Sequence, residues 1–145
     1  MNRHGFTLME VLIVIGLIGI IGALAIPRIG TALVRQSVRS SREAVVAMHA
    51  RARTAAVQRG RVTVLVVTGD KMHVLSRHPV TGALDTVGGV EDLHSRYGVT
   101  VTTTRDSLPF DSRGVGFAAG DTKIVVKKGA YQDDVDINAW GRIIR

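Results

Sequence analysis

Cysteine is absent from this chain of 145 residues, and prolines and aromatic residues are few. Without cysteine, neither a disulfide framework nor a thiolate metal site is possible, so a folded domain depends on packing and turn chemistry alone. Three prolines and two tyrosines do not indicate a low-complexity or aromatic-rich binding segment. The length suits one domain with a modest core in addition to a long N-terminal helical segment, which is described below.

Recognisable catalytic motifs are also missing. The five histidines show no His-Glu-x-x-His or similar ligand spacing, so we expect them at surface or turn positions. They are His4, His49, His73, His78 and His94. Ser107, Ser112 and the run from Gly114 to Gly116 form neither a nucleophile elbow nor a phosphate loop, and turns explain them better. We therefore expect a protein that is not an enzyme and that has no cofactor.

One spacing near the C-terminus leaves a metal alternative open. Asp134, Asp136 and Asn138 alternate like the start of a calcium-binding EF-hand loop. That loop requires Gly at its sixth position and Glu at its twelfth, whereas this chain has Ala139 and Arg145 there. We expect no metal site, and calcium binding is the alternative.

A long apolar run dominates the N-terminal part of the chain. It extends from Phe6 to Ile26 and contains one ionisable residue, Glu10. A helix of about 20 apolar residues crosses a bilayer. A carboxylate inside the membrane costs roughly 2.5–3.5 kcal/mol even on the milder insertion scales, so Glu10 is predicted to be functional. The alternative is that Glu10 lies at the headgroup level near the start of the helix.

Small residues recur within this apolar run. Gly16, Gly19 and Gly22 follow one another at every third position, and Ala23 lies four residues after Gly19. Such spacing allows helices to approach closely in lipid, where packing drives their association. Glycines also weaken a helix, so local flexibility during extraction from the membrane is a second interpretation.

The small residue Gly5 precedes the apolar run, whereas in an ordinary secretory signal a small-residue cleavage site follows it. The segment from Gly5 to Leu12, Gly-Phe-Thr-Leu-Met-Glu-Val-Leu, resembles the class III prepilin signal of type IV pilins and pseudopilins. This resemblance implies that a prepilin peptidase cleaves between Gly5 and Phe6 and methylates the new amino terminus of Phe6. It also implies that Glu10 meets that amino terminus, in its own or a neighbouring subunit, during filament assembly.

The basic excess of the chain lies after the apolar run. Residues 28–61 contain eight arginines and one acid, Glu43, whereas residues 62–145 carry no net charge. On a helix, five of these arginines share one narrow stripe opposite a broad apolar face that a sheet would cover. They are Arg28, Arg35, Arg39, Arg42 and Arg53. We interpret the stripe as a solvated face, with anionic headgroups or acidic filament neighbours as the alternatives.

The charges that flank the apolar run bear on its orientation. Arg3 is the one Lys or Arg of the leader, so the positive-inside rule, taken alone, places the C-terminal side in the cytoplasm. The pilin resemblance implies the opposite, with the leader inside and the globular part outside. We expect the orientation that the resemblance implies, since the peptidase site is the more specific signal.

The periodicity predicts one long helix followed by strands. The helix extends from about Thr7 to Gln58, bends at Pro27 and ends near Gly60. Strands are predicted at residues 61–68, 71–76, 97–104, 122–127, 135–137 and 142–144, with a hairpin turn at Gly69-Asp70. The fold class is therefore α+β, a long N-terminal transmembrane and amphipathic helix packed on an antiparallel β-sheet head, as in pilins.

Four segments of the chain are expected. They are a prepilin leader at 1–5, a transmembrane helix at 6–27, an amphipathic stem helix at 28–60 and a β-rich globular head at 61–145.

A second resemblance lies in the head. The turn Phe110-Asp111-Ser112-Arg113-Gly114, a following Thr-Lys-Ile-Val-Val strand and the ending Gly141-Arg142 resemble the GspH/FimT family of minor pseudopilins. This implies a structural and assembly subunit of a type II secretion pseudopilus, at or near its tip. It would be a single-pass protein of the inner membrane with its head on the periplasmic side. Its partners would be other pilin or pseudopilin subunits and the prepilin peptidase.

The alternative is a FimT-like minor type IV pilin that binds DNA in natural transformation. Some FimT-like proteins have a C-terminal Gly-Arg-x-Arg motif, whereas here the second arginine comes one position late. If DNA binds, we expect it at basic residues of the last strands. These candidates are Lys127, Lys128, Arg142 and Arg145.

Overall fold

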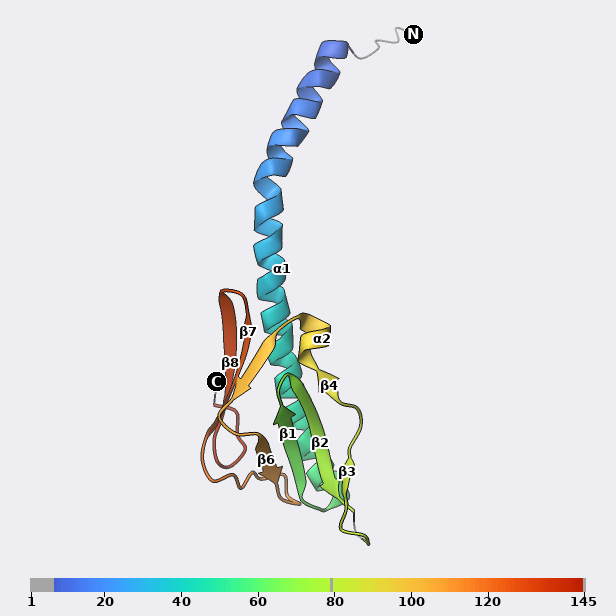
Figure 1. Cartoon of the computed structure of the whole chain (residues 1–145), viewed down its shortest axis with the longest axis vertical. Helices are drawn as coiled ribbons and strands as arrows, with labels where there is room; N and C mark the ends of the chain where they lie inside the picture. Colours follow the sequence, from blue (N-terminus) through green and yellow to red (C-terminus); the bar gives the residue numbers. More distant parts are fainter. Residues whose placement is uncertain (1–6, 79, 145) are drawn as a thin grey trace. The chain divides into compact units, whose positions relative to one another are not determined.

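The computed structural model describes residues 7–78 and 80–144, and for residues 25–28 it describes the backbone alone. The chain divides into two compact units, one up to Val34 and one from Arg35 onward. From here on we call the second unit the head, so that the head includes residues 35–59 of the long helix as well as the predicted β-rich part. It contains all the buried apolar residues of the core. The elements are α1 (Leu8–Arg59), β1 (Thr63–Thr68), β2 (Lys71–Arg77), β3 (Leu84–Thr86), β4 (Glu91–Asp92), α2 (Leu93–Tyr97), β5 (Thr100–Thr103), β6 (Ser107–Phe110), β7 (Thr122–Lys128) and β8 (Tyr131–Ile137) (Figure 1).

The long helix α1 begins and ends within one residue of its predicted limits. It continues without interruption through Pro27, and the bend expected there stays a prediction. Gly60 terminates it with a φ of 59°. The backbone N–H groups of Gly60 and Arg61 donate to the carbonyls of Val57 and Ala56, each at 3.2 Å, which is the Schellman pattern of a helix C-terminus.

Two antiparallel sheets follow α1. In the first, the strand order is β3-β2-β1-β6, and β4 pairs with β2; in the second, it is β5-β7-β8. Buried positions alternate along β1 and β7, so each strand turns one face to the core. The same buried cluster includes apolar residues of α1, so helix and sheets share one core. The predicted α+β class is confirmed.

The hairpin turn predicted at Gly69-Asp70 joins β1 to β2, with Thr68 paired to Lys71. Gly69 has a φ of 57°, a backbone conformation that few side chains tolerate. The Asp70 carboxylate accepts a hydrogen bond of 2.7 Å from the backbone N–H of Val101 in β5. This turn therefore links the first sheet to the second.

Several short elements differ from the predictions. The segment expected as a strand from Tyr97 begins as the end of helix α2, which Asp92 caps by accepting the Ser95 N–H at 2.8 Å. Strands β3, β4 and β6 were not predicted, and β8 is longer than expected. At the last predicted strand, the described residues form a single bridge between Ile137 and Ile143.

A buried cluster closes the C-terminal part of the head against α1. His49 is 3% exposed, and its Nε2–H donates to the Gly141 carbonyl at 3.0 Å. Its ring meets the Phe110 ring edge-on, with centroids 5.3 Å apart. Burial lowers the pKa of His49, because it disfavours the charged form of the ring. The surface or turn position expected for His49 is wrong, because a helical position on the apolar face of α1 points into the core.

Candidate assembly site

Glu10 lies in the first turn of α1. Its backbone N–H donates to the Thr7 hydroxyl at 3.2 Å and to the Thr7 carbonyl at 3.1 Å. Thr-x-x-Glu is the pattern of a helix capping box, a signal in the sequence that our interpretation of Glu10 missed. The positive end of the helix dipole also favours a carboxylate in this turn. Gly5 and Phe6, the predicted processing residues, lie outside the described part of the chain.

The apolar segment of α1 presents its side chains outward. This helix contains a window with a mean hydropathy of 2.6, long and apolar enough to cross a membrane, and none of that window is buried. A methyl group added at Gly16, Gly19 or Gly22 would meet no atom within 4 Å. The three glycines are therefore open to a neighbouring helix, as close packing in lipid requires.

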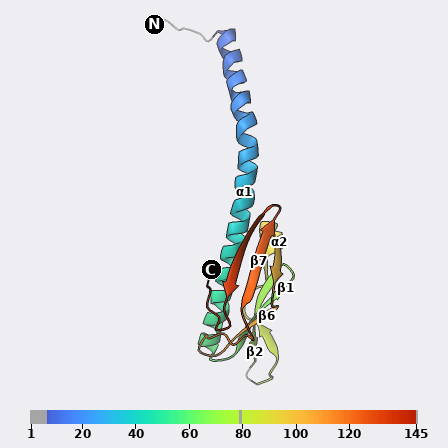
Figure 2. The same cartoon turned by 90° about the vertical axis from the view of Figure 1, so that its left-hand side faces the viewer.

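Three arginines of the stripe on α1 bind other parts of the head. Figure 2 shows the β7–β8 hairpin beside this helix. Arg35 donates to the Tyr131 hydroxyl at 3.2 Å and lies over its ring, 4.8 Å from the centroid. Arg53 donates to the Gly114 carbonyl at 2.9 Å. Arg42 lies between these two along the same stripe, and we call the three contacts the arginine seam.

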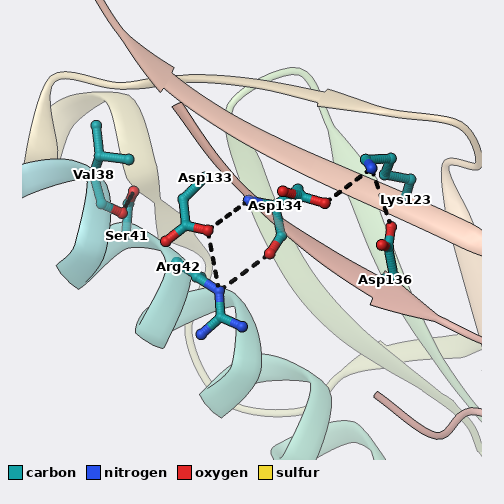
Figure 3. Close-up of polar contacts among 7 residues, drawn as sticks. All are labelled: Val38, Ser41, Arg42, Lys123, Asp133, Asp134 and Asp136. Carbon is teal, nitrogen blue, oxygen red and sulfur yellow. Dashed lines mark hydrogen bonds and ion pairs between the residues drawn. The ribbon is translucent and has the colours of Figure 1, made fainter. Parts of the chain in front are cut away.

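Arg42 forms the central contact of the seam (Figure 3). Its Nε donates to the Asp134 carbonyl at 3.1 Å and lies 3.4 Å from the Asp133 carboxylate. The guanidinium groups of these three arginines bind the C-terminal half of the head. Arg35 and Arg53 nevertheless stay exposed, as predicted for the stripe, whereas Arg42 is partly buried and departs from that prediction. Arg39 of the stripe is exposed as well.

Two acidic residues of β8 contact a lysine of β7. The Lys123 ammonium group lies 2.9 Å from the Asp134 carboxylate and 3.6 Å from that of Asp136 (Figure 3). The hydrogen bond to Asp134 and the two negative charges raise the pKa of Lys123. Lys123 therefore supplies positive charge to Asp134 and Asp136, two of the residues for which calcium binding was the alternative. Within residues 7–78 and 80–144, no group of three or more His, Asp or Glu side chains could hold a metal ion.

The described residues among those named for possible DNA contact do not gather in one place. Lys128 is committed to the fold, since its Nζ donates to the Tyr97 carbonyl at 2.6 Å and to the Ser37 hydroxyl at 3.2 Å. Lys127 is exposed beside it at the turn of the β7–β8 hairpin. Arg142 follows the other end of β8, about 20 Å away at the rise of a strand. Arg145 lies outside the described residues.

Comparison with known proteins found a matching sequence motif and similar structures. Residues 1–26 match the prokaryotic N-terminal methylation motif. The structure resembles two crystal forms of the type IV minor pilin FimU of Pseudomonas aeruginosa. The first has a TM-score of 0.60 at 18% identity and covers 75% of this chain and 87% of FimU. The second has a TM-score of 0.56 at 18% identity and covers 72% and 89%. No curated protein matches the chain significantly in sequence. The fold is therefore a pilin fold.

Proposed function

We propose that this chain, which joins a methylation motif to a pilin fold, is a minor pseudopilin of a type II secretion system. It would act as a structural and assembly subunit of the pseudopilus. The observation that carries the proposal is the position of Glu10, the one ionisable residue in an exposed apolar helical segment that the methylation motif covers. An isolated carboxylate there is unfavourable unless a partner supplies positive charge.

Processing would create the partner of that carboxylate. Cleavage between Gly5 and Phe6 removes the leader and leaves a positively charged, methylated amino group four residues before Glu10. The amino group of an incoming subunit pairs with Glu10 of its neighbour and offsets the desolvation of both charges in the membrane. This pairing gives each subunit a defined axial position, and the open glycines allow the helices to approach.

The arginine seam supports a mechanical role for the head. Residues 35–59 of α1 are tied to β8 by Arg35 and Arg42, and to the turn after β6 by Arg53. The β-sheets would therefore stay packed on residues 35–59 when the helix draws the subunit out of the membrane. The head would lie on the periplasmic side of the inner membrane, with other pilin-type subunits and the prepilin peptidase as partners.

A minor subunit of a type IV pilus is the second candidate. The likeness to FimU, itself a type IV minor pilin, supports it, whereas the resemblance of the Phe110–Gly114 turn to GspH supports the secretion assignment. DNA uptake receives less support, since the candidate contacts lie at opposite ends of β8. Deletion of the gene would separate the two candidates, because loss of exported enzymes indicates secretion and loss of surface pili indicates a pilus.

Glu10→Gln tests the proposed assembly role in a host that contains the filament machinery. We expect the variant to be cleaved and inserted in the membrane but lost from the sheared filament fraction, as measured by immunoblot. Glu43→Gln is the matched control, because it removes the same charge from an exposed position of the same helix. Equal incorporation of Glu10→Gln and the native chain would contradict the proposal.

A further inference from the structure

Four elements of the head meet at one end. Thr63, at the start of β1, pairs with Ser76 of β2 on one side and with Phe110 of β6 on the other, and α1 ends just before it. This topology gathers basic side chains that are separate in the sequence. We call it the basic end; its arginines are Arg59, Arg61, Arg77 and Arg113.

The basic end contains an open hollow of about 530 Å³. Its lining residues are Gly60, Arg61, Val62, Arg77, His78, Asp111 and Ser112. Arg61 and Arg77 are exposed, and no hydrogen bond or ion pair engages either guanidinium group within the described part of the chain. Two arginine side chains are therefore free to bind an anion that enters the hollow.

Asp111, the one carboxylate among the described lining residues, does not compete for these arginines. Its Oδ1 accepts the backbone N–H groups of Arg113 and Val115, each at 2.9 Å, and its Oδ2 accepts the Arg113 Nε at 3.1 Å. The backbone N–H of Val115 and the pairing with Arg113 lower the pKa of Asp111. The hollow thus keeps a net positive charge.

His78 adds a further donor to the hollow. Its Nδ1 accepts the backbone N–H groups of Val80 and Thr81, each at 3.3 Å. In the neutral ring the proton is therefore on Nε2, the nitrogen that the loop does not use. This nitrogen is therefore a hydrogen-bond donor for a bound anion.

Apolar side chains lie beside the arginines. Val62 lines the hollow and is 43% exposed. Leu84 is 58% exposed and pairs across the sheet with Arg77. Arginine is enriched at protein interfaces, and a partner that supplies both carboxylates and apolar side chains would contact both kinds of group here.

We propose that the basic end is a docking site for an acidic segment of a partner polypeptide. Carboxylates of the segment bind Arg61 and Arg77, and its apolar side chains contact Val62 and Leu84. A polypeptide fits better than a nucleic acid, because no aromatic residue lines the described hollow to stack a base and a phosphate backbone leaves the aliphatic groups without a partner. The proposal is independent of leader cleavage and of the type of filament.

Fluorescence anisotropy with the full-length protein in detergent micelles tests the site. The probes are a labelled short peptide of Glu, Leu and Gly, its counterpart with Gln in place of Glu, and a short labelled DNA duplex. The variant Arg61→Gln/Arg77→Gln is compared with Arg39→Gln/Lys127→Gln, which removes the same charge from exposed positions elsewhere on the head. Leu84→Ser tests the apolar contribution separately.

We expect the acidic peptide to bind and the Gln peptide not to bind. Loss of Arg61 and Arg77 should weaken binding at least about tenfold, as expected for two charge-assisted hydrogen bonds, whereas the control pair changes it little. Leu84→Ser should weaken peptide binding as well. Absence of binding, or equal weakening in both double variants, would overturn the proposal. Tighter binding of the duplex, lost with Arg61 and Arg77 but insensitive to Leu84, would overturn it in favour of a nucleic acid.

Discussion

Alanine at Gly141 should be among the most destabilising small substitutions in the head, because it combines backbone strain with a steric overlap. Gly141 has a φ of 74° and is buried. A Cβ there would lie 2.7 Å from Cε1 of Phe110 and 3.0 Å from the backbone nitrogen of Gly116. Phe110 belongs to the cluster around His49, and Gly116 forms a bridge with Phe110, so the ring and the backbone leave little space.

Two other glycines separate the contribution of backbone strain from that of steric overlap. Gly60 shares the left-handed conformation, with a φ of 59°, but an added Cβ would meet nothing within 4 Å. Gly116 lacks the positive φ, yet its Cβ would lie 2.5 Å from the Gly141 nitrogen. A left-handed alanine costs about 1–2 kcal/mol and overpacking about 1–3 kcal/mol. We expect losses of about 1–2 kcal/mol for Gly60→Ala, about 1–3 for Gly116→Ala and about 2–5 for Gly141→Ala.

Urea unfolding of the fragment 35–145, which contains the whole buried core, measures these losses. Circular dichroism and the fluorescence of Trp140, the single tryptophan, are two independent probes of the transition. The midpoints should fall in the order Gly60→Ala, Gly116→Ala, Gly141→Ala at an unchanged m-value. A Gly141→Ala variant as stable as Gly60→Ala would refute the steric part of the reasoning.

Two further predictions concern the buried histidine and the arginine seam. Because burial lowers the pKa of His49 below its ordinary value of 6.5, the unfolded chain binds a proton before the folded one does. The free energy of unfolding should therefore fall as the pH drops below about 6.5, and His49→Gln should reduce that dependence in urea titrations. Arg42→Ala removes the hydrogen bond from Nε to the Asp134 carbonyl and the ion pair with Asp133, and should lower stability by about 1–2 kcal/mol, with faster amide exchange in β7 and β8. Arg39→Ala, at an exposed position, should change stability by less than about 0.5 kcal/mol.

The long elements were predictable because each carries a local signal. An apolar face at helical spacing and Gly60 define α1 to within one residue. The Gly69-Asp70 pair defines the β1–β2 hairpin. By contrast, α2 has five residues, and its sequence has no sustained apolar period. It forms where Asp92 caps it and where Leu93 is buried in the core, and neither contact is visible in a short window of sequence.

The partners of the arginine stripe could not be predicted from the sequence. Periodicity places Arg42 and Arg53 on one line of the helix, but the groups that they bind are backbone carbonyls 92 and 61 residues away. Any residue has a carbonyl, so no side-chain pattern marks these acceptors. The basic end escaped prediction for a similar reason. Residues 62–145 are neutral in total, and the topology, not the composition, brings Arg77 beside Arg61.

The central claim is that the chain is a pilin-type subunit matured at Gly5-Phe6. Mass spectrometry of the N-terminal peptide tests it directly, on full-length protein from cells that contain or lack a prepilin peptidase. With the peptidase, the chain should begin at an N-methylated Phe6, and Gly5→Leu should keep the leader. A native chain that retains Met1 to Gly5 in the presence of the peptidase, or begins at another residue, would contradict the account.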